Sequence, residues 1–178
     1  MAMKLPWSWH AVARAGFLLM ILACVLALLL RPRPEVPGPA IELVDSDGSL
    51  QTISLRELKA MDVLVRGGTY QNQYGNWRDA GVYSGVLLSH LLPSTEYTHV
   101  EVEAADGYSR LLERSRVVDL GYPMVLAFAM DGVEVPAWED GFRIAVLPED
   151  GAVSNEEYEA ISAGSFWVKN VIRIRAVR

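Results

Sequence analysis

Cysteine is nearly absent from this 178-residue chain, because its single thiol, Cys24, lies inside an apolar N-terminal run. Everything after that run lacks the residues needed for a disulfide, a thiolate metal site or a cysteine nucleophile. Histidine is also scarce, since His10, His90 and His99 are scattered without ligand spacing between them. A zinc site built from Cys and His is therefore excluded.

Positive charge is scarce outside the N-terminus. All 22 acidic residues lie at or after Glu35, whereas four of the 16 basic residues precede it, so the rest of the chain has a net charge of 12 − 22 = −10. Nucleic-acid binding depends on the neutralisation of phosphates by Lys and Arg. We therefore expect this protein to bind neither nucleic acid nor, by charge, an anionic lipid surface.

The longest apolar segment is residues 15–30, AGFLLMILACVLALLL, which contain no charge. As a helix it spans about 24 Å, and flanking residues with a snorkelling Arg14 extend it towards a ~30 Å bilayer core. Trp7 and Trp9 precede it, as is typical of a membrane interface, and Arg31 follows it. We predict an uncleaved transmembrane signal anchor.

Two alternatives to a signal anchor are a lipoprotein, because residues 21–24 (ILAC) loosely resemble a lipobox, and a cleaved signal peptide. The residues after Cys24 are apolar where a lipoprotein has a polar tether, and no small-x-small cleavage site follows the run. With an anchor, residues 1–14 are an inner tail. Residues 31–40, which hold four prolines, are a stiff linker to a body outside the cytoplasm.

The body, residues 41–178, is mostly strand and turn, and we predict a strand-rich α+β fold with long loops on one edge. The expected strands are 41–44, 50–53, 62–66, 99–104, 125–130, 133–136, 142–148 and 171–177. The expected helices are 54–60, with a capping box from Ser54 and Glu57, and 84–92. Residues 67–81 are predicted to form a polar loop, and residues 154–163 a short helix or an ordered loop.

Two sequence patterns in the body are specific. Asp131-Gly132 joins two apolar segments and predicts a tight hairpin. In residues 171–177, the apolar side chains of Ile172, Ile174 and Ala176 alternate with arginines, which predicts one buried and one solvated face.

Several motifs occur in an order that matches a known family. They are QYGNWRDAGVYSGVLLSHLL (73–92), DGYS (106–109), MVLAFAMDGVEVP (124–136), DGFRIAVLPED (140–150) and WVKNVIRI (167–174). Through them the body resembles the molybdopterin-binding domain of sulfite oxidase and its small bacterial and archaeal relatives, over roughly residues 41–178. The resemblance implies a compact, strand-rich α+β fold around a pterin-bound molybdenum.

The sequence departs from this family at the positions that would hold the cofactor. The family binds molybdenum through a cysteine, and alignment on Gly75-Asn76 places Gln73 there, which supplies no thiolate. The family's histidine before glycine is replaced by Asp140, whose charge would repel the cofactor phosphate, and the tryptophan after the family lysine by Asn170. The family's arginine and lysine positions are retained.

The candidate cofactor-binding residues are Tyr70, Asn72, Gln73, Asn76, Arg78, Tyr108, Asp140, Arg143 and Lys169. Amides and arginine suit a planar heterocycle or a phosphate, and aromatic rings supply stacking faces. Alternatively, the polar side chains of residues 70–78 bond the backbone of their own loop, and Tyr108 is a core or rim aromatic. Arg143 and Lys169 are more simply explained as partners of nearby acids. Glu156, Glu157 and Glu159 are expected on a solvated face.

No nucleophile–base pair, paired-carboxylate motif or phosphate-binding glycine loop is present, so we predict no catalytic residue and no metal ligand. The main hypothesis is a cofactor-free ligand-binding or interaction module, acting alone or in a membrane complex. The first alternative is an oxidoreductase that holds molybdopterin through the cofactor's dithiolene, with Gln73 as a neighbour. The second is a purely structural membrane-tethered scaffold.

Overall fold

The computed structural model of the protein describes residues 38–92 and 96–178. The predicted tail, the predicted anchor at 15–30 and most of the linker lie outside these residues, and stay predictions. Within the described residues, no helix has the length and apolar character needed to cross a membrane.

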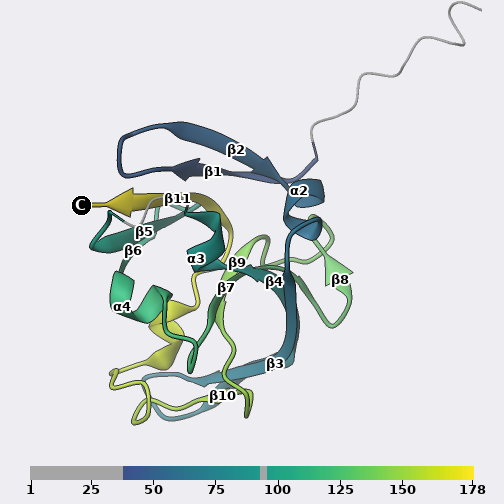
Figure 1. Cartoon of the computed structure of the whole chain (residues 1–178). Helices are drawn as coiled ribbons and strands as arrows, with labels where there is room; N and C mark the ends of the chain where they lie inside the picture. Colours follow the sequence, from purple (N-terminus) through teal and green to yellow (C-terminus); the bar gives the residue numbers. More distant parts are fainter. Residues whose placement is uncertain (1–37, 93–95) are drawn as a thin grey trace, which may run out of the picture. The chain divides into compact units, whose positions relative to one another are not determined.

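Strands dominate the described domain and form two mixed sheets (Figure 1). The first sheet has the order β2 (Leu50–Ser54), β1 (Ala40–Val44), β11 (Val171–Val177), β5 (His99–Ala104) and β6 (Ser109–Glu113). In it β1 and β11 are parallel, and the other pairs are antiparallel. The two predicted hairpin strands at its N-terminal edge are confirmed.

The second sheet has six strands. Their order is β10 (Ala152–Val153), β3 (Val63–Gln71), β4 (Trp77–Leu87), β7 (Met124–Met130) and β8 (Val133–Glu134), with β9 (Arg143–Val146) also paired to β7. Only β10 and β3 are parallel among the described pairs of this sheet. The hairpin predicted at Asp131-Gly132 is confirmed as the β7–β8 turn.

Helices are few and short. They are α2 (Leu55–Lys59), α3 (Leu88–Leu91), α4 (Arg114–Val117) and the 3₁₀ helix η1 (Ala163–Phe166), none longer than five residues. The α+β class predicted from the sequence is therefore wrong, and the described domain is a β structure of two mixed sheets. The capping box of α2 is confirmed, since Ser54 and Glu57 bond each other's backbone amides at 3.3 and 2.8 Å.

Two local predictions, the loop at 67–81 and the helix at 84–92, are wrong. The polar stretch 67–81 is not a loop but most of the β3–β4 hairpin, and only residues 72–76 form its turn. The helix predicted at 84–92 is strand as far as Leu87, because β4 lies between β3 and β7 and bonds both. Pairing of β4 with the distant strand β7 thus overrides the local helical pattern in residues 84–87. Residues 154–163 form an ordered loop, one of the two predicted alternatives.

Strand β11 follows the predicted alternation only in part. Ile174 and Ala176 are buried, but Ile172 is 42% exposed. A register irregularity between Val171 and Arg173 in the pairing with β5 explains the difference, because one extra residue reverses the faces that side chains occupy.

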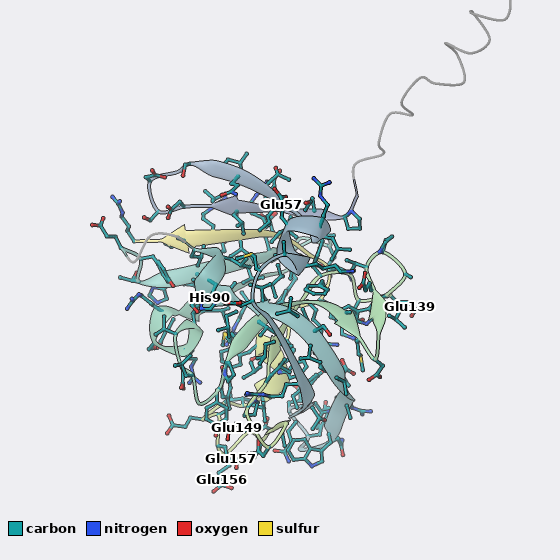
Figure 2. The ribbon with its side chains drawn as sticks, turned by 45° about the vertical axis from the view of Figure 1, so that its right-hand side comes forward. Glu57, His90, Glu139, Glu149, Glu156 and Glu157 are labelled. Atoms are coloured by element: carbon teal, nitrogen blue, oxygen red, sulfur yellow. The ribbon has the colours of Figure 1, made fainter. Side chains whose placement is uncertain are left out.

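Both sheets contribute to one core. Fully buried side chains include Val102 and Ile174 of the first sheet and Tyr83, Leu126 and Ile144 of the second. Acidic side chains lie outside this core, and Figure 2 shows Glu139, Glu149, Glu156 and Glu157 at the periphery of the domain. The solvated face predicted for Glu156, Glu157 and Glu159 is confirmed.

Candidate functional site

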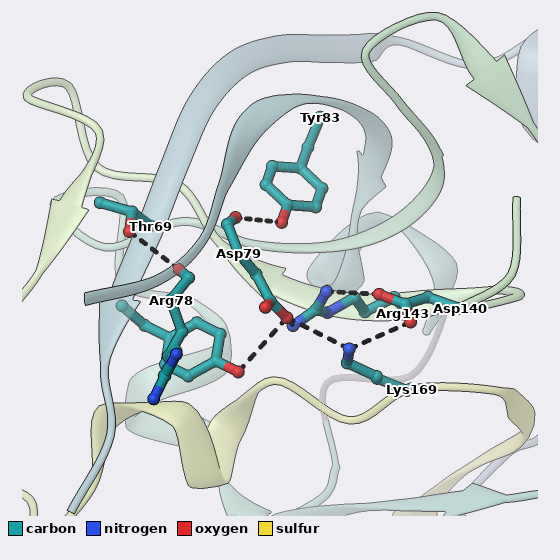
Figure 3. A network of polar contacts seen from close by, with 8 residues as sticks. Thr69, Arg78, Asp79, Tyr83, Asp140, Arg143 and Lys169 are labelled. Atoms are coloured by element: carbon teal, nitrogen blue, oxygen red, sulfur yellow. Dashed lines mark hydrogen bonds and ion pairs between the residues drawn. The ribbon is translucent and has the colours of Figure 1, made fainter. Parts of the chain in front are cut away.

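An ion-pair network lies at the centre of the residues that the family resemblance singles out. Arg143 opens β9, and it is the one charged side chain that is fully buried among the described residues. Its Nη2 lies 2.5 Å from Asp79 Oδ2 and its Nη1 lies 2.6 Å from Asp140 Oδ2. Lys169 Nζ lies 3.2 Å from Asp79 and 3.0 Å from Asp140 (Figure 3). Two cations and two anions thus neutralise one another.

Aromatic rings surround the buried guanidinium. The Cζ atom of Arg143 lies 5.8 Å from the ring centroids of Tyr70 and Tyr83, and 5.1 Å from that of Trp167. Cation–π contacts of this kind are worth about 0.5–2 kcal/mol, more when the cation is desolvated. Tyr70 Oη also donates to Asp79 Oδ2 at 3.3 Å, and Tyr83 Oη donates to the Asp79 carbonyl at 2.5 Å. The rings therefore hold both charged partners in place.

Asp79 reaches this network through an unusual backbone conformation. It lies in β4 with φ +51°, in the left-handed region that Asn and Asp occupy more readily than other residues with a Cβ. The pairing of β3 with β4 is irregular nearby, between Gly68 and Tyr70. Sequence reasoning missed Asp79. The available signal was charge balance. Two cations, Arg143 and Lys169, would otherwise have only Asp140 as an acidic partner, and Asp79 is the only acid in residues 67–81.

The ion pairs shift the pKa values of the network. Burial raises the pKa of Asp79, but the hydrogen bond and charge of Arg143, with those of Lys169, outweigh it and hold that pKa below its ordinary value. Burial lowers the pKa of Lys169, but the bonds to Asp140 and Asp79 outweigh it and raise that pKa. Burial also raises the pKa of Tyr83. Asp79 and Lys169 are therefore both ionised at neutral pH.

The tip of the β3–β4 hairpin is held by its own side chains. Asn72 Oδ1 accepts hydrogen bonds from the amides of Tyr74 and Asn76 at 2.9 and 3.0 Å. Asn155 Nδ2 donates to the Asn72 carbonyl at 2.8 Å. Gly75 has φ +77°, which the turn requires and glycine provides without strain. For Asn72, the interpretation that polar side chains bond their own backbone is confirmed.

The nine candidate residues do not form one site. Tyr70, Asp140, Arg143 and Lys169 belong to the ion-pair network, and the predicted pairing of the two cations with acids is confirmed. Gln73, Asn76 and Arg78 have exposed side chains at or beside the hairpin tip, where Asn72 is half-buried. Tyr108, 48% exposed, follows the turn after β5 in the other sheet.

The residues present do not fit a pterin-bound molybdenum. The position aligned with the metal-binding cysteine is Gln73, an exposed neutral side chain, and no other residue of the body carries a thiol. The retained cations are neutralised by Asp79 and Asp140, which leaves no excess positive charge for a phosphate. Within residues 38–92 and 96–178, no three His, Cys, Asp or Glu side chains are grouped to hold a metal ion.

Comparison with known proteins gives a structural relative only. No family model and no curated protein sequence matches the chain. Among solved structures, the sulfane dehydrogenase SoxCD from Paracoccus pantotrophus is similar, with a TM-score of 0.57 and 16% sequence identity. The match covers 78% of this chain and 38% of that one, so this chain spans well under half of the dehydrogenase chain. The two proteins have a related fold.

Proposed function

We propose that this protein is a membrane-anchored, extracytoplasmic domain of the sulfite oxidase type of fold that acts as a ligand-binding or interaction module without molybdenum. The likeness to the sulfane dehydrogenase SoxCD supports the fold named in this proposal. One fold supports many functions, so the role has to be argued from the site.

The observation that carries the proposal is the state of the residues that the family resemblance identifies. The family that the chain resembles holds molybdenum through a protein thiolate, and an anionic pterin phosphate needs unpaired cations. Here Gln73 is an exposed amide on a hairpin turn, and Arg143 is buried with both terminal nitrogens bonded to carboxylates. The network therefore fits a structural role that joins β4, β9 and the segment before β11.

Exposed aromatic side chains support an interaction role for the hairpin tip. Tyr74 is 78% exposed and Trp77 is 48% exposed, on a turn whose backbone is fixed by Asn72. Tyr and Trp are enriched among the residues that dominate binding energy at protein interfaces. Anchoring by residues 15–30 and the linker 31–40 would present this domain close to a membrane, in reach of a membrane complex.

The test is cofactor content. The full chain is purified in detergent from a molybdenum-replete host that makes the pterin cofactor, and a sulfite oxidase-type domain with its cysteine, produced in the same host, serves as the loading control. Molybdenum is measured by mass spectrometry and released pterin by fluorescence on the same sample. We expect no more than trace molybdenum in this protein and full loading in the control. Molybdenum and pterin near one per chain would overturn the proposal.

A further inference from the structure

Three arginines on one short segment lack acidic partners. Arg110 lies in β6, and Arg114 and Arg116 lie in α4, which follows it directly. Among the described residues, no carboxylate lies within 4.0 Å of any of the three. Residues 38–178 hold 21 acidic and 12 basic residues, a net charge of −9. Acidic side chains are therefore plentiful in this domain, yet these three arginines do not pair with them. Unpaired cations in such a domain call for an explanation.

Two of these arginines line a cavity of about 490 Å³ that lies away from the Arg143 network. Its walls come from β6, the residues after it and the segment that leads into η1, and include Arg110, Arg116, Ser162 and Ser165. A volume of this size is typical of a small-molecule site. The cavity is therefore large enough to hold a ligand beside the arginines.

One buried ring brings the two guanidinium groups together. The Cζ atom of Arg110 lies 4.5 Å from the ring centroid of Phe166, and that of Arg116 lies 5.2 Å from it. Arg116 is also held by Tyr158, whose carbonyl accepts a hydrogen bond from Nη1 at 3.2 Å and whose ring lies 4.7 Å away. Stacking on rings positions a guanidinium without neutralising it, so its charge stays available to an anion.

The remaining lining residues restrict the kind of anion. Glu113 and Glu159 also line the cavity and would repel a multiply charged ligand such as a phosphate dianion. Leu111 and Ile161 line it too, and their side chains are 54% and 90% exposed. A ligand with an apolar body would cover Leu111 and Ile161. With only one negative charge, bound by the arginines, it would have no second charge for the two glutamates to repel.

We propose that this cavity binds a small monocarboxylate, with the carboxylate held by Arg110 and Arg116 and the apolar body packed against Leu111 and Ile161. Arginine forms paired, charge-assisted hydrogen bonds with a carboxylate, which gives both affinity and orientation. The site deepens the module proposed above by giving it a ligand class, and to that extent it rests on that proposal.

The test uses benzoate, with the neutral benzamide as its isostere, on the isotope-labelled full chain in detergent. The buffer contains no other carboxylate, phosphate or sulfate, and binding is followed by backbone amide shifts in two-dimensional NMR. We expect saturable binding of benzoate with a Kd on the order of 1 mM, and shifts confined to β6, α4 and η1. Benzamide and inorganic phosphate should bind at least about 10-fold more weakly.

The deciding variant is Arg110→Gln, because this side chain makes a ring contact but no hydrogen bond or ion pair with the described residues. We expect it to fold normally and to weaken benzoate at least about 10-fold. Arg56→Gln, which removes an exposed arginine on α2, is the matched control and should leave the Kd unchanged. The proposal is overturned if wild type shows no saturable shifts, if phosphate binds more tightly than benzoate, or if the two variants behave alike.

Failure of this proposal and failure of the proposed function are distinguishable. Molybdenum and pterin are measured on the same preparation before the titration. If the protein is free of cofactor and does not bind benzoate, only the proposed carboxylate site is refuted. If the protein is loaded with molybdenum, the proposed function as a module without molybdenum is refuted.

Discussion

Replacement of Asp79 by Asn tests the central ion-pair network. The change removes one negative charge beside Arg143, whose side chain is fully buried. It keeps the size of the side chain and a residue type that tolerates φ +51°. The effect therefore reports the lost charge and its hydrogen bonds rather than backbone strain.

The expected loss of free energy of unfolding depends on the interactions that Arg143 keeps after the substitution. Breaking a wholly buried ion pair by removing one partner costs about 3–5 kcal/mol, whereas an exposed pair is worth about 0–1 kcal/mol. Asp140 still bonds Arg143, and the Asp79 side chain is 26% exposed, so water screens part of the loss. We expect the free energy of unfolding to fall by about 2–3 kcal/mol, which lowers Tm by roughly 5–12 °C.

The pH dependence supplies an independent check. The pKa of Asp79 lies below its ordinary value in the folded state, so the unfolded chain binds more protons in acid. The stability from Asp79 is fully present above about pH 5, and is lost as pH falls through the lowered pKa. The free energy of unfolding of wild type should therefore fall more between pH 7 and pH 4 than that of Asp79→Asn.

Two-state urea unfolding at several pH values measures both effects. Asp79→Ala is the comparison, since it also removes a side chain suited to the left-handed region and should cost about 1 kcal/mol more. An Asp79→Asn protein as stable as wild type at pH 7, with the same acid sensitivity, would refute the structural role of the network.

Three further outcomes are expected. Gln73→Cys should restore a thiol but not molybdenum retention, as measured by mass spectrometry, because the pocket cations stay neutralised; stoichiometric metal would contradict this. Gly85→Ala should lower the free energy of unfolding by at least about 2 kcal/mol in urea titrations, because its Cβ would lie 2.5 Å from the Leu126 carbonyl oxygen. Gly67→Ala, with no atom within 4 Å of its Cβ, is the control and should change little. Ser54→Ala should cost about 1 kcal/mol by removing the cap of α2, and an unchanged urea midpoint would argue against the capping box.

Elements with a local signal were predictable from the sequence. The β7–β8 hairpin has its Asp131-Gly132 turn, α2 has its capping box, and β5 has strict alternation. Each of these depends on residues within a few positions of one another. The order of motifs predicted a family fold, which no single motif could do, and the likeness to the sulfane dehydrogenase supports a related fold.

The features that the sequence did not predict depend on residues that are distant in sequence. Residues 67–81 are polar and show no alternation, yet they form most of the β3–β4 hairpin, and β3 also pairs with the distant strand β10 and contacts η1. Asp79 meets Arg143 across 64 positions of sequence, and no local pattern reports such a pair. Arg110 and Arg116 were not singled out either, because their significance comes from the cavity and from the absence of acid partners among the described residues.

The position of β11 has a consequence for how the domain comes to be folded. This strand lies in the middle of its sheet, between β1 and β5, and Arg173 bonds Glu42 across 131 positions of sequence. The β1–β2 and β5–β6 hairpins can form locally, but their inner edges stay open until residues 171–177 have been synthesised. Contacts of such long range slow folding, since a large loop must close first. The domain is thus expected to fold only once residues 171–177 are available, with β11 as the strand that joins two preformed hairpins.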